Sequence, residues 1–290
     1  MAGSKPQLMS STNDKRIDMH MHSTYSDGVR TPAELIAMAR SKGLAGLALT
    51  DHDSIEGFRE LSAAAAGAGV EVMTGVELSC EYNGKDLHVL AYGVDADNVA
   101  LQSLLRDFRG ARERRGERIV EKLAEQGVHI DMERVKAKAG NGSLGRPHIA
   151  EALIEAGYVP DHAQAFARYI GEGCPAHVDK FKMQPEQAVQ SIHAARGLAF
   201  VAHPGYYMED FDAFLRLLDA GFDGVEVFHP YHIPPVITRL LALARDRGLL
   251  ISGGSDFHGF AGRDNMGEPA VPHALFERIQ ETLVERRKAR

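Results

Sequence analysis

The sequence predicts an α/β fold in which a barrel of strands carries polar side chains at its carboxyl ends. Three observations favour this prediction. Short apolar runs alternate with helical segments, seven of these runs carry a histidine or a carboxylate at or near their end, and one purely helical stretch interrupts the alternation. The seven runs lie at residues 16–22, 47–53, 72–77, 87–90, 199–203, 224–227 and 251–258. Because the strands of barrel enzymes point their carboxyl ends at one pocket, we expect these polar residues to share a site.

The elements before residue 98 alternate between strand and helix. After the first strand, Thr31-Pro32-Ala33-Glu34 provides an N-cap, a proline at the first helical position and an acid in the first turn, and Gly43 ends this helix. Asn83-Gly84 is typical of a hairpin turn. The other expected elements are a strand to residue 50, an alanine-rich helix at 55–66, a strand to 77 and a strand at 86–93.

The pattern changes at about Asn98, after which we expect helices without a strong strand. These helices cover residues 98–126, 146–156 and 161–169, and the strand–helix alternation returns near Met183. The simplest interpretation is a helical insertion domain at 98–177. It would interrupt one barrel domain whose two parts are 16–97 and 178–290. We expect residues 1–15 to be a disordered leader.

The bulk composition excludes several classes of protein. The 290 residues are 44% hydrophobic and carry a net charge of -7, which is ordinary for a globular protein and unsuited to general polyanion binding. Two cysteines argue against a disulfide-stapled secreted protein. No apolar run is long enough for a membrane span, and the first 15 residues lack the apolar core of a signal peptide. We therefore expect a cytoplasmic protein, and no stable protein partner is indicated.

Two pairs of potential metal ligands stand near the two ends of the chain. His20 and His22 lie two residues apart on a predicted strand, so both imidazoles point to one face. Asp256 and His258 repeat this spacing, and Asp27 adds a carboxylate in a tight turn. Mixed histidine and carboxylate ligands suit manganese, zinc or iron better than calcium. About nine candidate ligands are too many for one ion, and clustered ions recur in phosphoester hydrolysis.

These motifs resemble, in their order, those of the PHP (polymerase and histidinol phosphatase) family over about residues 16–262. The motifs are His20-Met21-His22-Ser23, Ser26-Asp27-Gly28, Leu49-Thr50-Asp51-His52-Asp53, Gly75-Val76-Glu77-Leu78-Ser79, Leu87-His88-Val89-Leu90, Val201-Ala202-His203-Pro204-Gly205 and Gly254-Ser255-Asp256-Phe257-His258. The resemblance implies a distorted seven-stranded (β/α) barrel with two or three metal ions. The ligands that it implies are His20, His22, Asp27, His52, Glu77, His88, His203, Asp256 and His258.

Two features are similar to one subgroup of that family, the 3',5'-nucleoside bisphosphate phosphatases and a related 5'-3' exoribonuclease. They are the His-Ser-x-x-Ser-Asp-Gly motif at 22–28 and the helical insertion after His88. Gly145-Arg146-Pro147-His148 resembles the segment of that subgroup that contacts phosphate. We therefore expect Arg146 and His148 to bind the substrate. Tyr206, also expected at the substrate site, stands where these relatives usually have an arginine.

The resemblance implies attack on phosphorus by a metal-bound hydroxide, with Mn²⁺ as the favoured ion and Zn²⁺ or Fe²⁺ as alternatives. Asp27, His52, His203 and Arg146 are the expected catalytic residues. Three functions stay open: a phosphatase that removes the 3'-phosphate of nucleoside 3',5'-bisphosphates, a 5'-3' exoribonuclease on short RNA, and a non-catalytic metal-binding module. The complete set of ligands argues against the third.

The roles of three further features each have two possible interpretations. Asp51 orients His52 or caps the following helix, and Glu226 is either a metal ligand or a carboxylate that fixes a histidine tautomer. A basic cluster on the long helix is either a strip for an RNA backbone or a solvated helix face with neighbouring acids. The cluster comprises Arg106, Arg109, Arg112, Arg114, Arg115 and Arg118.

Overall fold

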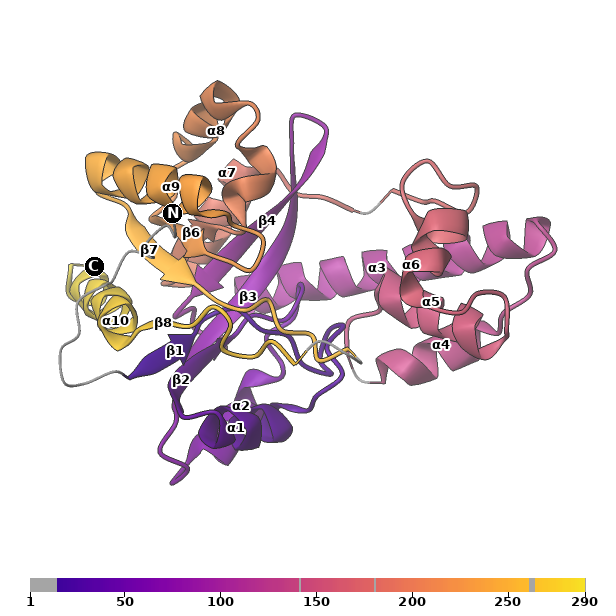
Figure 1. The fold of residues 1–290 in the computed structure, drawn as a ribbon, viewed down its shortest axis with the longest axis horizontal. Coiled ribbons are helices and arrows are strands. Elements are labelled where there is room, and N and C mark those ends of the chain that lie inside the picture. Colours follow the sequence, from indigo (N-terminus) through magenta and orange to yellow (C-terminus); the bar gives the residue numbers. More distant parts are fainter. Residues whose placement is uncertain (1–14, 141, 180, 261–263, 290) are drawn as a thin grey trace, which may run out of the picture.

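The computed structural model describes residues 15–140, 142–179, 181–260 and 264–289. Apart from Lys15, the expected leader lies outside these residues. The chain forms one sheet with the strand order β7-β6-β5-β4-β3-β2-β1-β8, with helices packed around it (Figure 1). The strands are β1 (Arg16–Asp18), β2 (Leu44–Leu49), β3 (Glu71–Tyr82), β4 (Lys85–Tyr92), β5 (Leu198–Val201), β6 (Gly224–Phe228), β7 (Leu250–Gly253) and β8 (Val271–Pro272).

The sheet curls into a nearly closed barrel. Beyond the ends of β1 and β7, the Met19 amide donates to the Gly253 carbonyl at 3.2 Å and the His22 amide donates to the Phe257 carbonyl at 2.8 Å. Strands β1 to β7 lie at the seven apolar runs, and the two-residue β8 adds an eighth strand antiparallel to β1. The predicted α/β architecture is confirmed.

Strand β4 departs from a regular β/α repeat because it follows β3 through a tight hairpin. Asn83 and Gly84 have φ angles of 51° and 75°, as the predicted two-residue turn requires. Strand β4 therefore runs antiparallel to both β3 and β5. This reversal places His88 opposite Ser79 and beside the end of β5, where the Ala202 amide donates to the His88 carbonyl at 3.1 Å.

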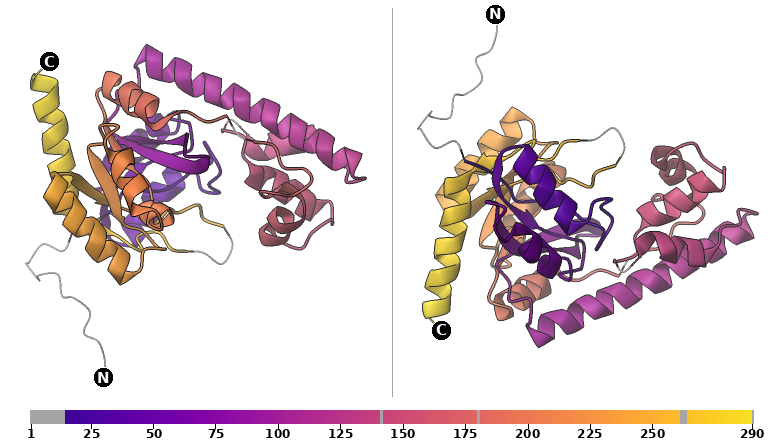
Figure 2. Two further views of the ribbon diagram at one scale, coloured as in Figure 1. Left: turned by 90° about the horizontal axis from the view of Figure 1, so that it is seen from above. Right: turned by 90° about the horizontal axis from the view of Figure 1, so that it is seen from below.

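Six described helices pack around the barrel (Figure 2). They are α1 (Pro32–Ser41), α2 (Phe58–Ala65), α7 (Pro185–Ala194), α8 (Phe211–Leu218), α9 (Pro234–Arg247) and α10 (His273–Lys288). Helix α1 begins as predicted, because Thr31 Oγ1 accepts from the Glu34 amide at 3.2 Å and the Glu34 carboxylate accepts from the Thr31 amide at 2.8 Å. This capping box satisfies two amides that have no partner within the helix.

A helical segment, residues 99–140 and 142–170, stands beside the barrel (Figures 1 and 2). It contains α3 (Val99–Glu125), α4 (Met132–Ala139), α5 (Arg146–Glu155), α6 (His162–Ala165) and the π-helical turn η1 (Phe166–Ile170), of which α4 is additional to the expected helices. Leu101 and Leu105 of α3 join the barrel core, whereas Ile119 and Leu123 belong to a separate core within the segment. Helix α3 thus links two cores, and the domain boundaries at 98 and 177 stay a prediction.

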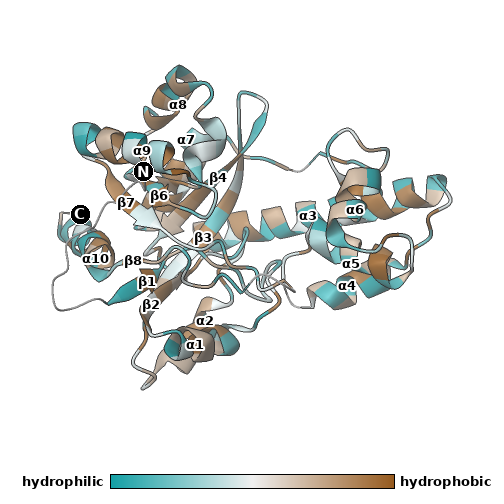
Figure 3. Ribbon diagram, viewed as in Figure 1, coloured by the Kyte–Doolittle hydropathy of each residue, from teal (hydrophilic) through white to brown (hydrophobic). Residues whose placement is uncertain are grey.

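An apolar core fills the barrel below the polar strand ends. Leu90, Tyr92 and Phe200 are fully buried, and the Tyr92 hydroxyl donates to the Met19 carbonyl at 2.9 Å. Apolar residues run along the strands, while α3 is polar over much of its surface (Figure 3). Within the described residues, the structure has no helix with the length and apolar character of a membrane span.

Candidate metal centre

The carboxylate of Glu77, on β3, lies at the centre of a cluster of imidazoles. Glu77 is buried, and five histidines from other positions around the barrel approach its two oxygens. The distances are 3.3 Å from His20 Nε2, 3.3 Å from His22 Nε2, 3.1 Å from His52 Nδ1, 2.9 Å from His88 Nδ1 and 3.0 Å from His203 Nε2. The polar ends of the strands therefore meet in one place.

Two loops complete the cluster with Asp27, Asp256 and His258. One Asp256 oxygen lies 3.4 Å from His20 Nε2 and 3.2 Å from His22 Nε2. One Asp27 oxygen lies 3.3 Å from His258 Nε2. The structure thus brings together all nine residues that the family resemblance implies as ligands.

The donor atoms form three groups, within each of which all atoms lie within 4.8 Å of one another. The groups are His20, His22, Glu77 and Asp256; His22, Asp27, His52 and His258; and His52, Glu77 and His88. His203 is in none of them and contacts Glu77. Since a carboxylate offers two oxygens, Glu77 is suited to bridge two ions.

Several donor atoms of the described residues are buried without a hydrogen-bond partner. Such atoms show whether the cluster is suited to bind a cation. They are Nε2 of His20, Nε2 of His22, Oδ1 of Asp27, Nδ1 of His52, Oε2 of Glu77 and Nδ1 of His203. Leaving a buried polar atom unsatisfied costs about 1–3 kcal/mol, and a divalent ion would satisfy several of them at once. The donor set therefore fits divalent metal ions.

The electrostatics of the cluster leave Glu77 and His52 in the forms that bind metal and keep a competing proton on His22. Burial would raise the pKa of Glu77, but the imidazoles of His52 and His88 hold it well below its usual range. Burial lowers the pKa of His52 well below its usual range, so this ring is neutral near pH 7. Burial would also lower the pKa of His22, but Asp256 and Glu77 raise it to about 10. An ion bound at His22 must therefore displace a proton.

Glu226, on β6, holds two of the histidines and belongs to none of the donor groups. Its carboxylate lies 2.9 Å from His20 Nδ1 and accepts a hydrogen bond from the His203 amide at 2.7 Å. The first contact occupies Nδ1 of His20 and leaves Nε2 facing Glu77. Of the two interpretations of Glu226, the structure favours the carboxylate that fixes a histidine tautomer.

Asp51 fixes the loop that carries Asp27. The sequence does not predict this role, because it indicates only that Asp51 orients His52 or caps the following helix. Its carboxylate accepts from the amide and the hydroxyl of Ser23, both at 2.7 Å, and from the Ser26 hydroxyl at 2.7 Å. The physical reason is the parallel pairing of β1 with β2, which places the loops after the two strands side by side.

Asp18 and Asp53 support the cluster in the same way, and sequence reasoning missed both. Asp18 accepts from the Ser255 amide at 2.9 Å, next to Asp256, and Asp53 accepts from the Ser79 amide at 2.8 Å. Asp53 and Asp256 have φ angles of 50° and 51°, a conformation that persists in non-glycine residues only where surrounding contacts enforce it. The sequence offers one signal for each residue: Asp18 stands two positions before His20, and Asp53 directly follows His52.

The loop before α5 comes close to Asp27, and Arg146 and His148 lie in the first turn of the helix that follows it. A Cβ placed on Gly145 would lie 3.8 Å from the Asp27 Cβ, so the two loops are close. His148 is buried, burial lowers its pKa, and its Nδ1 accepts from the Gly145 amide at 2.9 Å. The neutral ring therefore carries its proton on Nε2. The Arg146 guanidinium lies 5.2 Å from the centroid of the Phe166 ring.

Two arginines of the basic cluster turn from α3 toward the barrel. Arg112 Nε donates to the Asp53 carboxylate and Arg115 Nε donates to the Val178 carbonyl, both at 2.7 Å. Burial, followed by the charge of nearby Arg146, lowers the pKa of Arg115 to about 10. The cluster is therefore not uniformly a solvated helix face. Its exposed members are Arg106, Arg114 and Arg118.

The metal centre opens on two sides. A cleft of about 770 Å³ between the barrel and the helical segment is lined by Asp27 and His258. On the other side Tyr206, on the 3₁₀ turn η2 (Pro204–Tyr207), is 56% exposed, and its ring centroid lies 5.4 Å from that of His203. Tyr206 thus stands beside the cluster, where the sequence places it.

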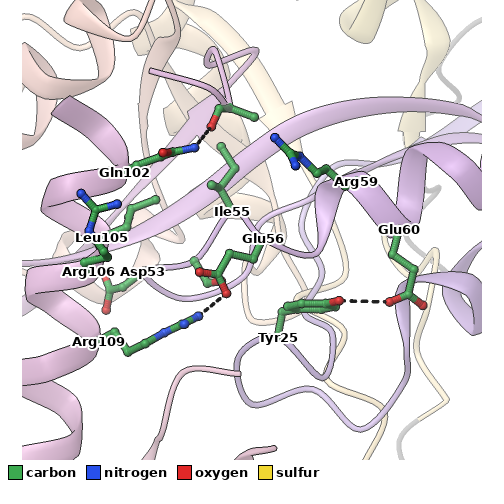
Figure 4. Close-up of a pocket in the computed structure, with 12 residues that line it drawn as sticks. Tyr25, Asp53, Ile55, Glu56, Arg59, Glu60, Gln102, Leu105, Arg106 and Arg109 are labelled. Carbon is green, nitrogen blue, oxygen red and sulfur yellow. Dashed lines mark hydrogen bonds and ion pairs between the residues drawn. The ribbon is translucent and has the colours of Figure 1, made fainter. Parts of the chain in front are cut away.

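A separate cavity of about 490 Å³ lies between α2 and α3, on the other side of the loop that carries Asp53 (Figure 4). Arg109 pairs with Glu56 there, and the Tyr25 hydroxyl donates to Glu60 at 3.3 Å. None of the nine clustered donors lines this cavity, so it is not the candidate metal centre.

The fold and the cluster define the class of protein, an α/β barrel whose strand ends gather donors for divalent metal ions. The model of the PHP domain family matches residues 18–209, and the chain belongs to this family.

The chain is similar to characterised relatives over most of its length. It is 35% identical over 264 residues to the 5'-3' exoribonuclease of Haemophilus influenzae, covering 88% of this chain and 94% of the relative. It is also 35% identical over 255 residues to the 3',5'-nucleoside bisphosphate phosphatase of Chromobacterium violaceum, covering 86% and 90%. The crystal structure of a candidate metal-dependent phosphoesterase from Bifidobacterium adolescentis matches with a TM-score of 0.84 at 31% identity, covering 91% of this chain and 94% of that chain.

Proposed function

We propose that this protein is a metal-dependent phosphoesterase that removes the 3'-phosphate of nucleoside 3',5'-bisphosphates. The observation that carries the proposal is the convergence of nine candidate metal ligands, with Glu77 at their centre and the Arg146 loop beside them. The names of the relatives support hydrolysis of nucleotide phosphoesters, since one is a nucleoside bisphosphate phosphatase and another an exoribonuclease.

The nine side chains would hold two or three divalent ions. Their mixture of imidazole and carboxylate suits Mn²⁺, with Zn²⁺ and Fe²⁺ as alternatives. Bound ions supply Lewis-acid polarisation of the phosphoryl group and activation of a water nucleophile. Glu226, Asp18, Asp51 and Asp53 would keep the ligands in position before the ions arrive.

Arg146 and His148 would bind the phosphate on the Asp27 side. The guanidinium of Arg146 is planar and permanently charged, so it can hold a phosphate through two parallel hydrogen bonds. His148 would donate from Nε2 to a phosphate oxygen or to the ester oxygen, because the Gly145 amide occupies its Nδ1. Binding by these two residues would orient the reacting group toward the metal ions.

Asp27, His52 and His203 are the side chains that we propose to act at the reacting phosphate in addition to binding metal. Asp27 lines the cleft beside the helical segment, and His203 borders the opening at Tyr206. At these positions both residues would lie next to an entering substrate. His52 lies between them, 3.1 Å from Glu77 and 3.9 Å from Asp27.

The second candidate function is a 5'-3' exoribonuclease on short RNA. The observation that favours it is the grouping of Arg112 and Arg115 with Arg146, which would extend the anion-binding surface beyond one phosphate. A non-catalytic metal-binding module is the least favoured function, because every expected ligand is present.

Phosphate release from adenosine 3',5'-bisphosphate tests the proposal, using metal-stripped protein with and without added Mn²⁺. We expect metal-dependent release of one phosphate per molecule, and product analysis should identify the 5'-monophosphate. If ions bind but no phosphate appears, the bisphosphate is not the substrate. The same protein should then be assayed on 5'-phosphorylated RNA oligonucleotides.

A further inference from the structure

Two tyrosines at the mouth of the metal centre expose more than half of their side chains. Tyr206 is 56% exposed and Tyr231 is 59% exposed. They come from different parts of the barrel, since Tyr206 follows β5 and Tyr231 follows β6. Their ring centroids lie 6.2 Å apart, with the ring planes at 53°. Two neighbouring aromatic rings left open to water form a small apolar surface, a feature that often marks a binding site.

Both rings are in contact with histidines of the metal centre or next to it. The Tyr206 ring lies 5.4 Å from the His203 ring, and the Tyr231 ring lies 5.5 Å from the ring of His229. His229 Nε2 in turn lies 3.5 Å from an oxygen of Asp256. A phosphate ester whose organic group extends to this side of the metal centre would meet these rings.

Tyr231 also lines a cavity of about 550 Å³ that reaches the metal centre. Asp256 and His258 line the same cavity, so it is continuous with the cluster of donors. Its volume is in the range of small-molecule sites, and neither Arg146 nor His148 lines it. This cavity shares His258 and Phe260 with the cleft beside the helical segment, whereas Tyr231 lines this cavity and not that cleft.

We propose that Tyr206 and Tyr231 form a stacking platform for the nucleobase of the substrate, an inference that rests on the proposed function. Every base has a flat π face that stacks on aromatic side chains, so the platform selects for a base without reading its identity. Tyr206 and Tyr231 are specificity residues in this proposal, because they contact the leaving nucleoside and take no part in activating water.

The test compares two ligands that differ only in the base, adenosine 3',5'-bisphosphate and the base-free 1,4-anhydroribitol 3,5-bisphosphate, which keeps the sugar ring. Binding is measured by calorimetry on metal-stripped protein, and turnover on protein with Mn²⁺. The variants are Tyr206→Ala and Tyr231→Ala, with Tyr206→Phe and Tyr231→Phe to preserve the rings. Ile233→Ala is the matched control, since Ile233 is 60% exposed on the same loop and has no aromatic face.

We expect each alanine variant to weaken binding of the nucleotide by at least about fivefold and to leave the base-free ligand unchanged. The phenylalanine variants should lose less nucleotide binding than the alanine variants, because they keep the aromatic rings, and Ile233→Ala should bind both ligands as the wild-type protein does. Equal losses for both ligands, or no loss for either, would overturn the platform. Base-dependent binding without turnover by the wild-type protein would keep the platform and reject the proposed function. Turnover by the wild-type protein, with unchanged base preference in the alanine variants, would support the proposed function and reject the platform.

Discussion

The metal centre and the helical segment beside it differ in how firmly the fold positions their functional side chains. Donors such as His20, His22 and Glu77 are buried, come from strand ends, and are fixed by further carboxylates. Arg146, by contrast, is only partly buried and stands on a helix that belongs to a separate core. The comparison indicates that metal binding depends on the barrel, whereas the helical segment can change the substrate without disturbing the ions.

The largest effect that this comparison predicts is at the ligands themselves. His22→Ala and Asp256→Ala should each reduce activity more than about a hundredfold, which exceeds the effect expected for residues that only support ligands. The reason is that each removes a donor from a group that no neighbour can replace. Bound metal should be counted by elemental analysis. Asp246→Ala on the exposed face of α9 is a control, and full activity in either ligand variant would contradict the assignment.

Glu226→Gln should have the next largest effect. The amide keeps the shape of the side chain but removes the charge that faces His20 Nδ1 and allows the wrong tautomer. We expect metal affinity to fall by about 10- to 100-fold while the fold is kept. A metal titration monitored by activity, with circular dichroism as the check on folding, measures this. Unchanged affinity would show that Glu226 does not set the tautomer.

Arg146→Ala should lower kcat/KM by at least about tenfold, because it removes the charge-assisted hydrogen bonds of the guanidinium to phosphate. Bound metal should stay unchanged, because Arg146 is in none of the donor groups. Arg168→Ala is a suitable control, since it is an exposed arginine of the same segment. Wild-type activity in Arg146→Ala would remove Arg146 from the substrate site.

The role of the basic cluster can be separated from that of the phosphate loop by salt dependence. If Arg115 contacts an RNA backbone, Arg115→Gln should weaken RNA binding and reduce the slope of log affinity against log salt by about one. Exposed Arg118, on the outer face of α3, provides the matched variant Arg118→Gln, which should leave the slope unchanged. Identical slopes in both variants would exclude Arg115 from the RNA path.

The smallest expected effect lies away from both regions, at Asp223. Burial would raise the pKa of this carboxyl, but His193, the Ala199 amide and Arg286 hold it below its usual range. Because the folded pKa is depressed, the stabilisation is complete above about pH 4 and is lost as the pH falls through the folded pKa. Asp223→Asn should therefore lower the free energy of unfolding by about 1 kcal/mol at pH 7.

Urea unfolding of the metal-stripped wild-type protein and of Asp223→Asn measures this difference. The difference should shrink as the pH is lowered toward 3. A difference that stays constant over this range would show that the charge of Asp223 does not stabilise the fold.

The sequence by itself determined the elements and the ligand types. Alternating apolar runs predicted the strands, Thr31 and Glu34 predicted a capped helix, and Asn83-Gly84 predicted the turn that reverses β4. These features are local, because propensity, capping and turn geometry depend on residues a few positions apart. The same locality explains why His20 and His22 were recognisable as a pair.

Only the tertiary structure decided how distant residues meet. Asp51 faces Ser23, Asp18 faces Ser255 and Arg112 faces Asp53, and each contact joins loops that chain folding brings together. Tyr206 and Tyr231 likewise lie side by side only because the fold brings together the loops that follow β5 and β6. No local pattern encodes such contacts, because they depend on strand order and on helix packing rather than on spacing along the chain.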